Sequence, residues 1–217
     1  MALENDERLK ELLRDTLKQK DVIKWGYVRT FGGPNAASCD SVAAHIAAVS
    51  TLATILGYEY SEEIEVKTGI KLDLAKLTLL GLVHDLGECR SGDTGATGHA
   101  VHGTCNLFSL EREGLAKITD GLIIEKIALE LFDDYRAYRT PEAIFLHVAD
   151  NIEGFEKGMS ISFGRGESAK FAEDVVLENV EIYNNKKEMF PQMSGFIDFC
   201  VNEILQRSID VVRKAYR

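Results

Sequence analysis

The sequence predicts a single all-α domain, a helical bundle of about seven to nine helices. Three observations lead to this prediction. Apolar residues recur at helical spacing through most of the chain, no stretch alternates convincingly with the period of two that marks a half-buried strand, and no repeat or low-complexity linker divides the 217 residues. A chain of this length suits one domain, so we expect residues 1–217 to fold as a unit.

The first half of the chain begins with an amphipathic helix over residues 4–20, where leucines recur among charged residues. Glycine, proline and asparagine at 31–38 predict a loop. Asp40 or Ser41 then caps a helix whose apolar positions continue to Gly57, which fits a stop.

The second half contains the more apolar helices. Residues 73–88 start with an Asp cap and are apolar nearly all round, which predicts a central, buried helix. The glycine-rich segment 91–103 is irregular, and 121–138 shows one apolar face. Pro141 suits the first turn of a helix that runs to about residue 163. Further helices are expected at 167–187 and 194–217.

Composition and charge exclude several classes of protein. The net charge of -10 argues against nucleic-acid binding, which needs a broad basic surface, although a metal ion and a few basic side chains can still create a pocket for a small anionic substrate. There is no apolar run of about 18 residues and no secretory signal, so we expect a cytoplasmic protein without a membrane partner. The cysteines form no CxxC pair and are expected to be reduced thiols: Cys39, Cys89, Cys105 and Cys200.

The helix predicted at 73–88 carries polar residues that an apolar helix should not bury without a reason. His84 and Glu88 are four residues apart and share one helical face, with Asp85 adjacent to it. A histidine beside carboxylates suits a divalent transition metal ion.

Two more polar residues lie on apolar stretches elsewhere. His45 points inward from its own helix, and Asp150 lies within the apolar run FLHVADNIEGF. Taken singly, the histidine is more often a core residue and the aspartate more often a cap or an ion-pair partner. Together with His84 and Asp85 they supply four ligands of mixed nitrogen and oxygen type, which would leave coordination positions for water or substrate.

The run LVHDLGECRSGD, residues 82–93, resembles the HD-domain metal-dependent phosphohydrolases and, within them, the 5'-deoxynucleotidase branch. The segments SVAAH at 41–45, PEAIFLHVAD at 141–150 and KWGYVR at 24–29 resemble further motifs of that branch in the same order. The resemblance covers about residues 20–160. The C-terminal helices would then pack on this core or form a dimer interface.

The resemblance implies one divalent transition metal ion, Mn, Co, Fe or Zn, with the ligands His45, His84, Asp85 and Asp150. It implies that Glu88 acts as general acid or base and that Asp93 assists proton transfer or binds a sugar hydroxyl. The implied reaction is phosphate release from a nucleoside 5'-monophosphate, with the deoxy form favoured, or from a similar small phosphate ester, by a homodimer. The expected substrate-binding residues are Lys24, Trp25, Arg29 and Arg90.

The sequence departs from the family pattern at positions expected near the substrate. Ala44 replaces an acidic residue, Lys24 stands where arginine is common, and the loop up to Asp40 is long. His99 and His102 are unusual, and they keep open an alternative, a dinuclear iron HD oxygenase, although their close spacing favours one metal ion. A non-catalytic nucleotide-sensing protein is a further alternative. We expect His147 to pack or to support a metal ligand.

Overall fold

The structure is a computed structural model that describes residues 6–24, 40–93, 104–162 and 166–216. Over these residues the backbone is helical apart from turns and one isolated antiparallel bridge between Ile23 and Ser41, which confirms the all-α prediction. The helices are α1 (Asp6–Lys18), α3 (Val42–Thr68), α4 (Leu74–Val83), α5 (Glu88–Ser91), α7 (Thr104–Thr119), α8 (Glu125–Ala137), α9 (Pro141–Ser162), α10 (Gly166–Met189), α11 (Ser194–Phe199) and α12 (Arg207–Ala215). A 3-10 turn, η2 (Pro191–Met193), precedes α11, and a π-helical segment, η3 (Cys200–Gln206), joins α11 to α12.

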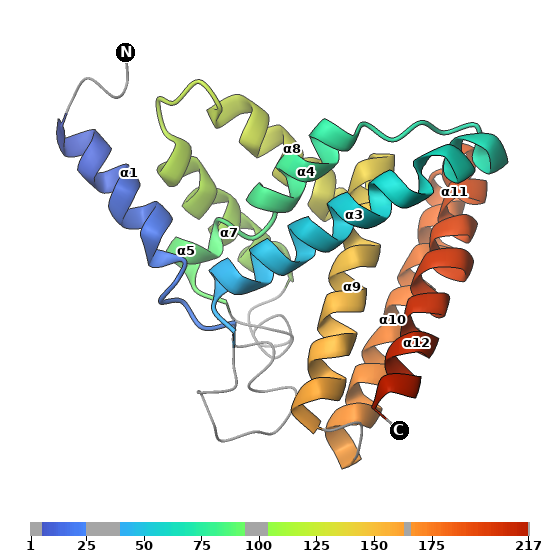
Figure 1. Ribbon diagram of the computed structural model, residues 1–217. Coiled ribbons are helices and arrows are strands. Elements are labelled where there is room, and N and C mark those ends of the chain that lie inside the picture. The colour runs from blue at the N-terminus through green and yellow to red at the C-terminus, as the bar shows by residue number, and fades with distance from the viewer. Residues whose placement is uncertain (1–5, 25–39, 94–103, 163–165, 217) are drawn as a thin grey trace.

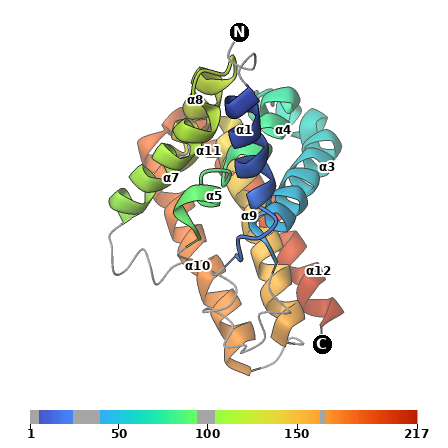
Figure 2. The same ribbon diagram turned by 90° about the vertical axis from the view of Figure 1, so that its left-hand side faces the viewer.

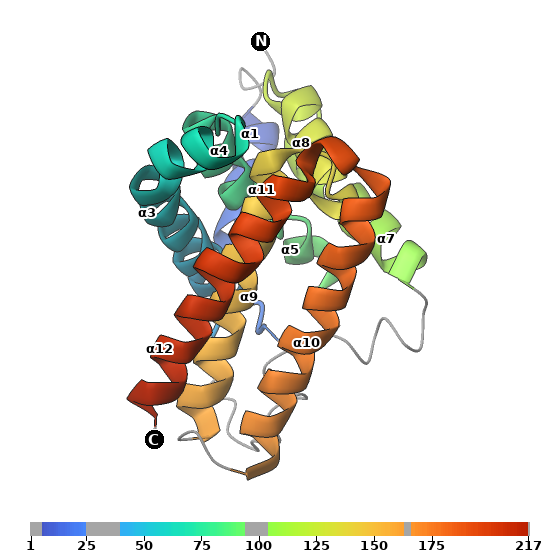
Figure 3. The same cartoon turned by 90° about the vertical axis from the view of Figure 1, so that its right-hand side faces the viewer.

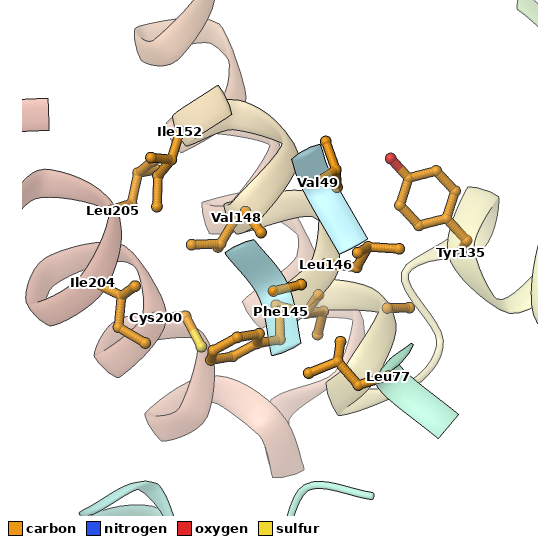
Figure 4. Packing of buried hydrophobic residues seen from close by; sticks show 14 of the residues in the cluster. Val49, Leu77, Tyr135, Phe145, Leu146, Val148, Ile152, Cys200, Ile204 and Leu205 are labelled. Atoms are coloured by element: carbon orange, nitrogen blue, oxygen red, sulfur yellow. The ribbon is translucent and has the colours of Figure 1, made fainter. Parts of the chain in front are cut away.

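Helix α9 is the centre of the bundle. It packs against α3, α4, α8, α10 and α12, and Figure 1 shows it between these elements. Its first half, 143–149, is buried at every position, and Phe145, Val148 and Ile152 face Cys200, Ile204 and Leu205 of the C-terminal segment (Figure 4). The prediction that 73–88 forms the central helix is therefore wrong: α4 borders the core, and its Leu82 is half exposed.

Helix α3 begins where the sequence predicts but extends further. Ser41 is its N-cap, and the Ser41 hydroxyl accepts a hydrogen bond from the Ala44 amide. The predicted stop at Gly57 is wrong, since α3 continues to Thr68 and ends at Gly69, whose φ of 73° is left-handed. Gly57 instead allows close packing, because a Cβ atom there would lie 2.9 Å from a methyl carbon of Leu77 in α4.

The chain leaves helical geometry immediately after α4, so the continuous helix predicted over 73–88 is also wrong. The Leu86 amide bonds the Val83 carbonyl and the Glu88 amide bonds the Asp85 carbonyl, which are tight three-residue turns. These turns pack on α7, a helix that the sequence analysis did not predict. A Cβ atom at Gly87 would lie 2.1 Å from the Glu111 carbonyl oxygen, so only glycine fits at this contact.

Two further groups of helices complete the bundle. Helices α10 and α12 run beside α9, which Figure 3 shows from one side. Helices α1, α5 and α7 form the second group, with α5 between α1 and α7 (Figure 2). Helix α1 is held there by polar contacts: Arg8 donates to the carbonyl oxygens of Ile118 and Asp120, and Asp15 is buried against Arg90. The leucines of α1 at 9, 13 and 17 are exposed.

Among the described residues, α3 alone is long and apolar enough to cross a membrane by length and composition. Core helices of soluble proteins meet the same criterion. The residues Val42, Ile46, Val49 and Ala53 are buried, and α3 packs on α4 and α9, which favours a core helix.

The Gly87 contact makes a prediction about stability. We expect Gly87→Ala to lower the free energy of unfolding by more than about 2 kcal/mol, because the added methyl group overlaps a backbone carbonyl that cannot move alone. Gly154→Ala in α9 is the control, since a Cβ atom there meets nothing within 4 Å and alanine should stabilise the helix by about 0.5–1 kcal/mol. Urea unfolding measures both, and equal effects would contradict the close approach.

Candidate metal centre

Four polar side chains from three parts of the fold meet at one point. His45 lies in the second turn of α3, His84 and Asp85 follow the end of α4, and Asp150 is in the middle of α9. The His45 and His84 Nε2 atoms are 3.4 Å apart, and His45 Nε2 is 3.3 Å from Asp85 Oδ2 and 3.4 Å from Asp150 Oδ1. The four residues predicted as ligands are thus brought together by the fold.

Close helix packing brings the two histidines together. At Gly81, one turn before His84, a Cβ atom would lie 2.8 Å from the Ser50 hydroxyl and 3.0 Å from the Ser50 Cα atom. Glycine at this position therefore lets α4 approach α3 closely. The approach carries His84 to within reach of His45.

Hydrogen bonds orient both imidazole rings toward the centre. His84 Nδ1 lies 2.7 Å from the Gly81 carbonyl oxygen and His45 Nδ1 lies 3.1 Å from Glu153 Oε2, so each Nδ1 is assigned the proton that it donates. Each Nε2 atom then faces the centre, where it presents a lone pair when the ring is neutral. Such outer partners commonly fix the ring orientation of metal-ligating histidines.

Asp150 is oriented by an aromatic side chain. The Tyr135 hydroxyl donates to Asp150 Oδ2 at 2.8 Å, which leaves Oδ1 for the centre. The Tyr135 ring stacks on His147 at 3.9 Å between centroids, and His147 stacks in turn on Tyr138 at 3.8 Å. His147 also donates through Nε2 to the Tyr135 carbonyl oxygen. His147 therefore supports a predicted ligand through Tyr135, as expected.

Asp85 is the most heavily contacted of the four side chains. Its Oδ2 atom faces the two histidines and also lies 2.6 Å from the Lys24 ammonium, while its Oδ1 atom lies 3.3 Å from an Arg136 nitrogen. Although burial alone would raise the pKa of Asp85, these cations and His84 hold the pKa well below its usual range. Asp85 is therefore a carboxylate and an acceptor on both oxygens.

The carboxylates also determine the charge of the histidines. Burial and Lys24 lower the pKa of His45, but hydrogen bonds to Asp85 and Glu153 and the charge of Asp150 prevail and raise it to about 10. Burial lowers the pKa of His84, so this ring is neutral. Although burial opposes it, the interactions with His45 and His84 hold the pKa of Asp150 below its ordinary value.

Glu88, the predicted acid or base, lies next to the four side chains. Both of its oxygens are 2.9 Å from the Lys24 ammonium, which also contacts Asp85. Burial and the negative charge of Asp85 outweigh Lys24 and raise the pKa of Glu88 to about 8. Asp93 is close enough to contribute to this upward shift. It follows Gly92, whose φ of 76° and ψ of 152° are a backbone conformation that residues with side chains rarely adopt.

The predicted substrate-binding residues are only partly described. Lys24 joins the cluster through Asp85 and Glu88, whereas Trp25, Arg29, His99 and His102 lie outside the described residues. The guanidinium of Arg90 is bound to Asp15 and Glu11 of α1. It lines a groove of about 540 Å³ between α1, α5 and α7, together with Arg14, Lys18 and Lys117. A phosphate contact by Arg90 stays a prediction.

The donor atoms fit a divalent metal ion. Two neutral or deprotonable imidazoles and two ionised carboxylates are the ligand types that divalent transition metals accept, and the ligand types alone do not select one of Mn, Co, Fe or Zn. Two metal-ligand groups can be formed from the described residues, one with His84 and Asp85 and one with Asp150 and Glu153. Both include His45, and neither group among the described residues combines Asp150 with His84 and Asp85. His45 Nε2 links the two groups, because it lies 3.3 Å from Asp85 Oδ2 and 3.4 Å from Asp150 Oδ1.

The comparison with protein families agrees with this geometry. A family model described as the HD domain matches residues 32–173, which span all four converging side chains. The chain belongs to the HD domain family. Proteins of this family are generally metal-dependent phosphohydrolases that bind a divalent ion.

Two solved structures with this fold come from archaea. A conserved hypothetical protein from Pyrococcus furiosus is 20% identical with a TM-score of 0.66, and the match covers 94% of this chain and 99% of that one. A protein from Pyrococcus horikoshii is 17% identical with a TM-score of 0.64, covering 93% and 99%. At these identities the likeness shows the fold alone. No curated protein matches the chain significantly.

The structure adds contact residues that the sequence analysis missed. Three of them contact the four converging side chains directly: Glu153, Tyr135 and Arg136. The fourth, Glu111, contacts Arg136. Glu153 could have been predicted from the sequence, because it lies three residues after Asp150 and on the same face of the same helix. The others come from α7 and α8, whose packing on the turn after α4 has no local signature.

The raised pKa of His45 predicts a proton release. At pH 7 the ring is protonated, and it must become neutral to coordinate a metal ion. We expect release of about one proton for each ion bound at pH 7, and affinity that rises with pH up to about 10. Calorimetric titration with Mn²⁺ in buffers of different ionisation enthalpy measures the release. Glu153→Gln removes one cause of the raised His45 pKa, so this variant should release fewer protons for each ion bound. Metal binding by the wild type without proton release would contradict this description of the centre.

Proposed function

We propose that this HD-domain protein is a phosphomonoesterase that releases phosphate from a nucleoside 5'-monophosphate, with the deoxy form favoured. The observation that supports the proposal most strongly is the convergence of His45, His84 and Asp85, whose ligand atoms lie within 4.8 Å of one another. Glu88 and Lys24 lie directly beside these atoms. A hydrolytic site needs a metal ion, a proton carrier and a cation for phosphate in this proximity.

The residues of the chain divide the chemistry between them. A divalent ion at this centre would polarise a phosphoryl oxygen and lower the pKa of a bound water. Lys24 is a buried ammonium, and we assign it the task of neutralising a second phosphoryl oxygen. Glu88, with a pKa of about 8, carries its proton at pH 7 and delivers it to the 5'-oxygen as the P–O bond breaks.

The preference for a deoxy substrate rests on the residues predicted to contact sugar and base. We assign Asp93 to a sugar hydroxyl, because it is half buried and close to Lys24 and Glu88. Trp25 is proposed to stack on the base, and Arg29 and Arg90 to contact phosphate. Asp150 is about one-third exposed, which supports approach of a small substrate from that side.

We further propose that the enzyme is a cytoplasmic homodimer with no nucleic-acid or membrane partner. The net charge of -10 supports the part of this proposal that concerns nucleic acid. The dimer rests on the family resemblance alone.

The test is phosphate release by protein stripped of metal and reloaded in turn with Mn, Co, Fe, Zn or Mg. The panel contains ribo- and deoxyribonucleoside mono- and triphosphates together with sugar phosphates. We expect selective release from deoxyribonucleoside monophosphates, and Asp85→Ala should lose metal binding and turnover together. The proposal would be contradicted if metal-loaded protein released no phosphate from any compound of the panel, or if Asp85→Ala retained activity.

Glu88 gives a separate prediction about the proton carrier. We expect Glu88→Gln to lower kcat by about 10²–10⁴-fold, because an amide cannot donate the proton that the leaving oxygen needs. Mn²⁺ affinity should change little, since Glu88 is not among the four converging ligands. Steady-state kinetics and calorimetry measure the two effects, with the exposed Glu113→Gln as control. A kcat that remains within about threefold of the wild type would exclude this role for Glu88.

A further inference from the structure

We propose that Arg136 of α8 and Glu111 of α7 form a positioning pair that directs a single oxygen of Asp85 to the metal centre. The inference rests on the metal site of the proposed function, and it concerns how the chain orients one ligand. Neither residue belongs to the converging set itself.

The two oxygens of Asp85 have separate partners. Oδ1 lies 3.3 Å from Arg136 Nη2. Oδ2 lies 2.6 Å from the Lys24 ammonium, 3.3 Å from His45 Nε2 and 3.5 Å from His84 Nε2. A carboxylate rotates readily about its terminal bond and can bind a metal ion through one oxygen or both. The bond from Arg136 retains Oδ1, so Asp85 offers only Oδ2 to the ion.

The guanidinium of Arg136 is itself fixed. Its Nη2 atom also donates to Glu111 Oε2. The guanidinium carbon lies over three aromatic rings at 4.7–5.3 Å from their centroids: Phe108, Phe132 and Tyr135. Aromatic faces attract a cation and restrict it sideways. The Arg136 side chain is only 18% exposed, so water competes weakly for these contacts.

Glu111 is anchored through its backbone as well as its side chain. Its carbonyl oxygen lies where a Cβ atom of Gly87 would be, in the turn that follows Asp85. The same residue of α7 therefore contacts that turn and holds Arg136. The position of Asp85 relative to Arg136 is set by this double contact.

A purely structural role for Arg136 would be to link α7 with α8. The chain contains a matched pair with that role alone. Arg112 of α7 donates to Asp133 of α8 at 2.7 Å, and both side chains are more than one-third exposed. Arg112→Met therefore removes an ion pair between the same two helices without touching Asp85.

The experiment compares Arg136→Met/Glu111→Gln with Arg112→Met, using metal binding without substrate. The double variant leaves no buried unpaired charge from the pair, so we expect it to fold. Its Mn²⁺ affinity should fall by about 10–100-fold, as for other outer partners of metal ligands. Its visible Co²⁺ spectrum should change, because Asp85 Oδ1 is no longer held by Arg136 and can bind the ion together with Oδ2. Arg112→Met should keep the wild-type affinity and spectrum.

Arg136→Lys is a milder variant that keeps the buried positive charge. An ammonium lacks the flat guanidinium that lies on the three aromatic rings and fixes the directions of its N–H groups, so we expect a smaller loss of affinity with the same direction of spectral change. Wild-type affinity and spectrum in the folded double variant would overturn the inference, as would an equal loss in Arg112→Met. If the double variant does not fold, unchanged metal binding by Arg136→Lys overturns it.

The metal-binding test of the positioning pair does not depend on whether the protein releases phosphate. A wild-type protein that binds metal but releases no phosphate would contradict the proposed function, and loss of affinity in the variants would still support the positioning pair. Conversely, an active enzyme whose double variant binds metal normally would retain the function and exclude the pair.

Discussion

The contact between His45 and His84 at the crossing of α3 and α4 is the constraint on which the rest of the structure depends. The two Nε2 atoms lie 3.4 Å apart, and both side chains are almost fully buried beside the Asp85 carboxylate. Polar groups withdrawn from water in this way are unfavourable unless each has a partner. The close approach is possible only because Gly81 has no side chain to separate the helices.

Each of the four converging side chains uses one atom for the centre and another for a neighbour that orients it. The pairs are His84 with the Gly81 carbonyl, His45 with Glu153, Asp150 with Tyr135 and Asp85 with Arg136. The neighbours come from α4, α8 and α9, so three helices contribute to the orientation of the ligands. The centre therefore depends on the buried packing of these helices as well as on the four side chains themselves.

The sequence predicted the helical architecture and the converging residues because both depend on patterns within single helices. Apolar periodicity marked α9 and α10, and polar residues on apolar faces marked His45 and Asp150. Helix α7 was not predicted. The break after Val83 escaped prediction, since the turn that follows packs on α7 through Gly87, a tertiary contact with no local signature. Arg136 was missed for the same reason: nothing in its local sequence shows that a buried carboxylate faces it.

The metal centre proposed for this chain binds a single divalent ion through two imidazole nitrogens and two carboxylate oxygens. Electron spin echo envelope modulation on protein loaded with one equivalent of Mn²⁺ detects histidine nitrogens that are coupled to the ion. We expect two nitrogen couplings, with one lost in His45→Ala and one lost in His84→Ala. A spectrum without histidine couplings, or one that neither substitution changes, would show that the ion binds elsewhere.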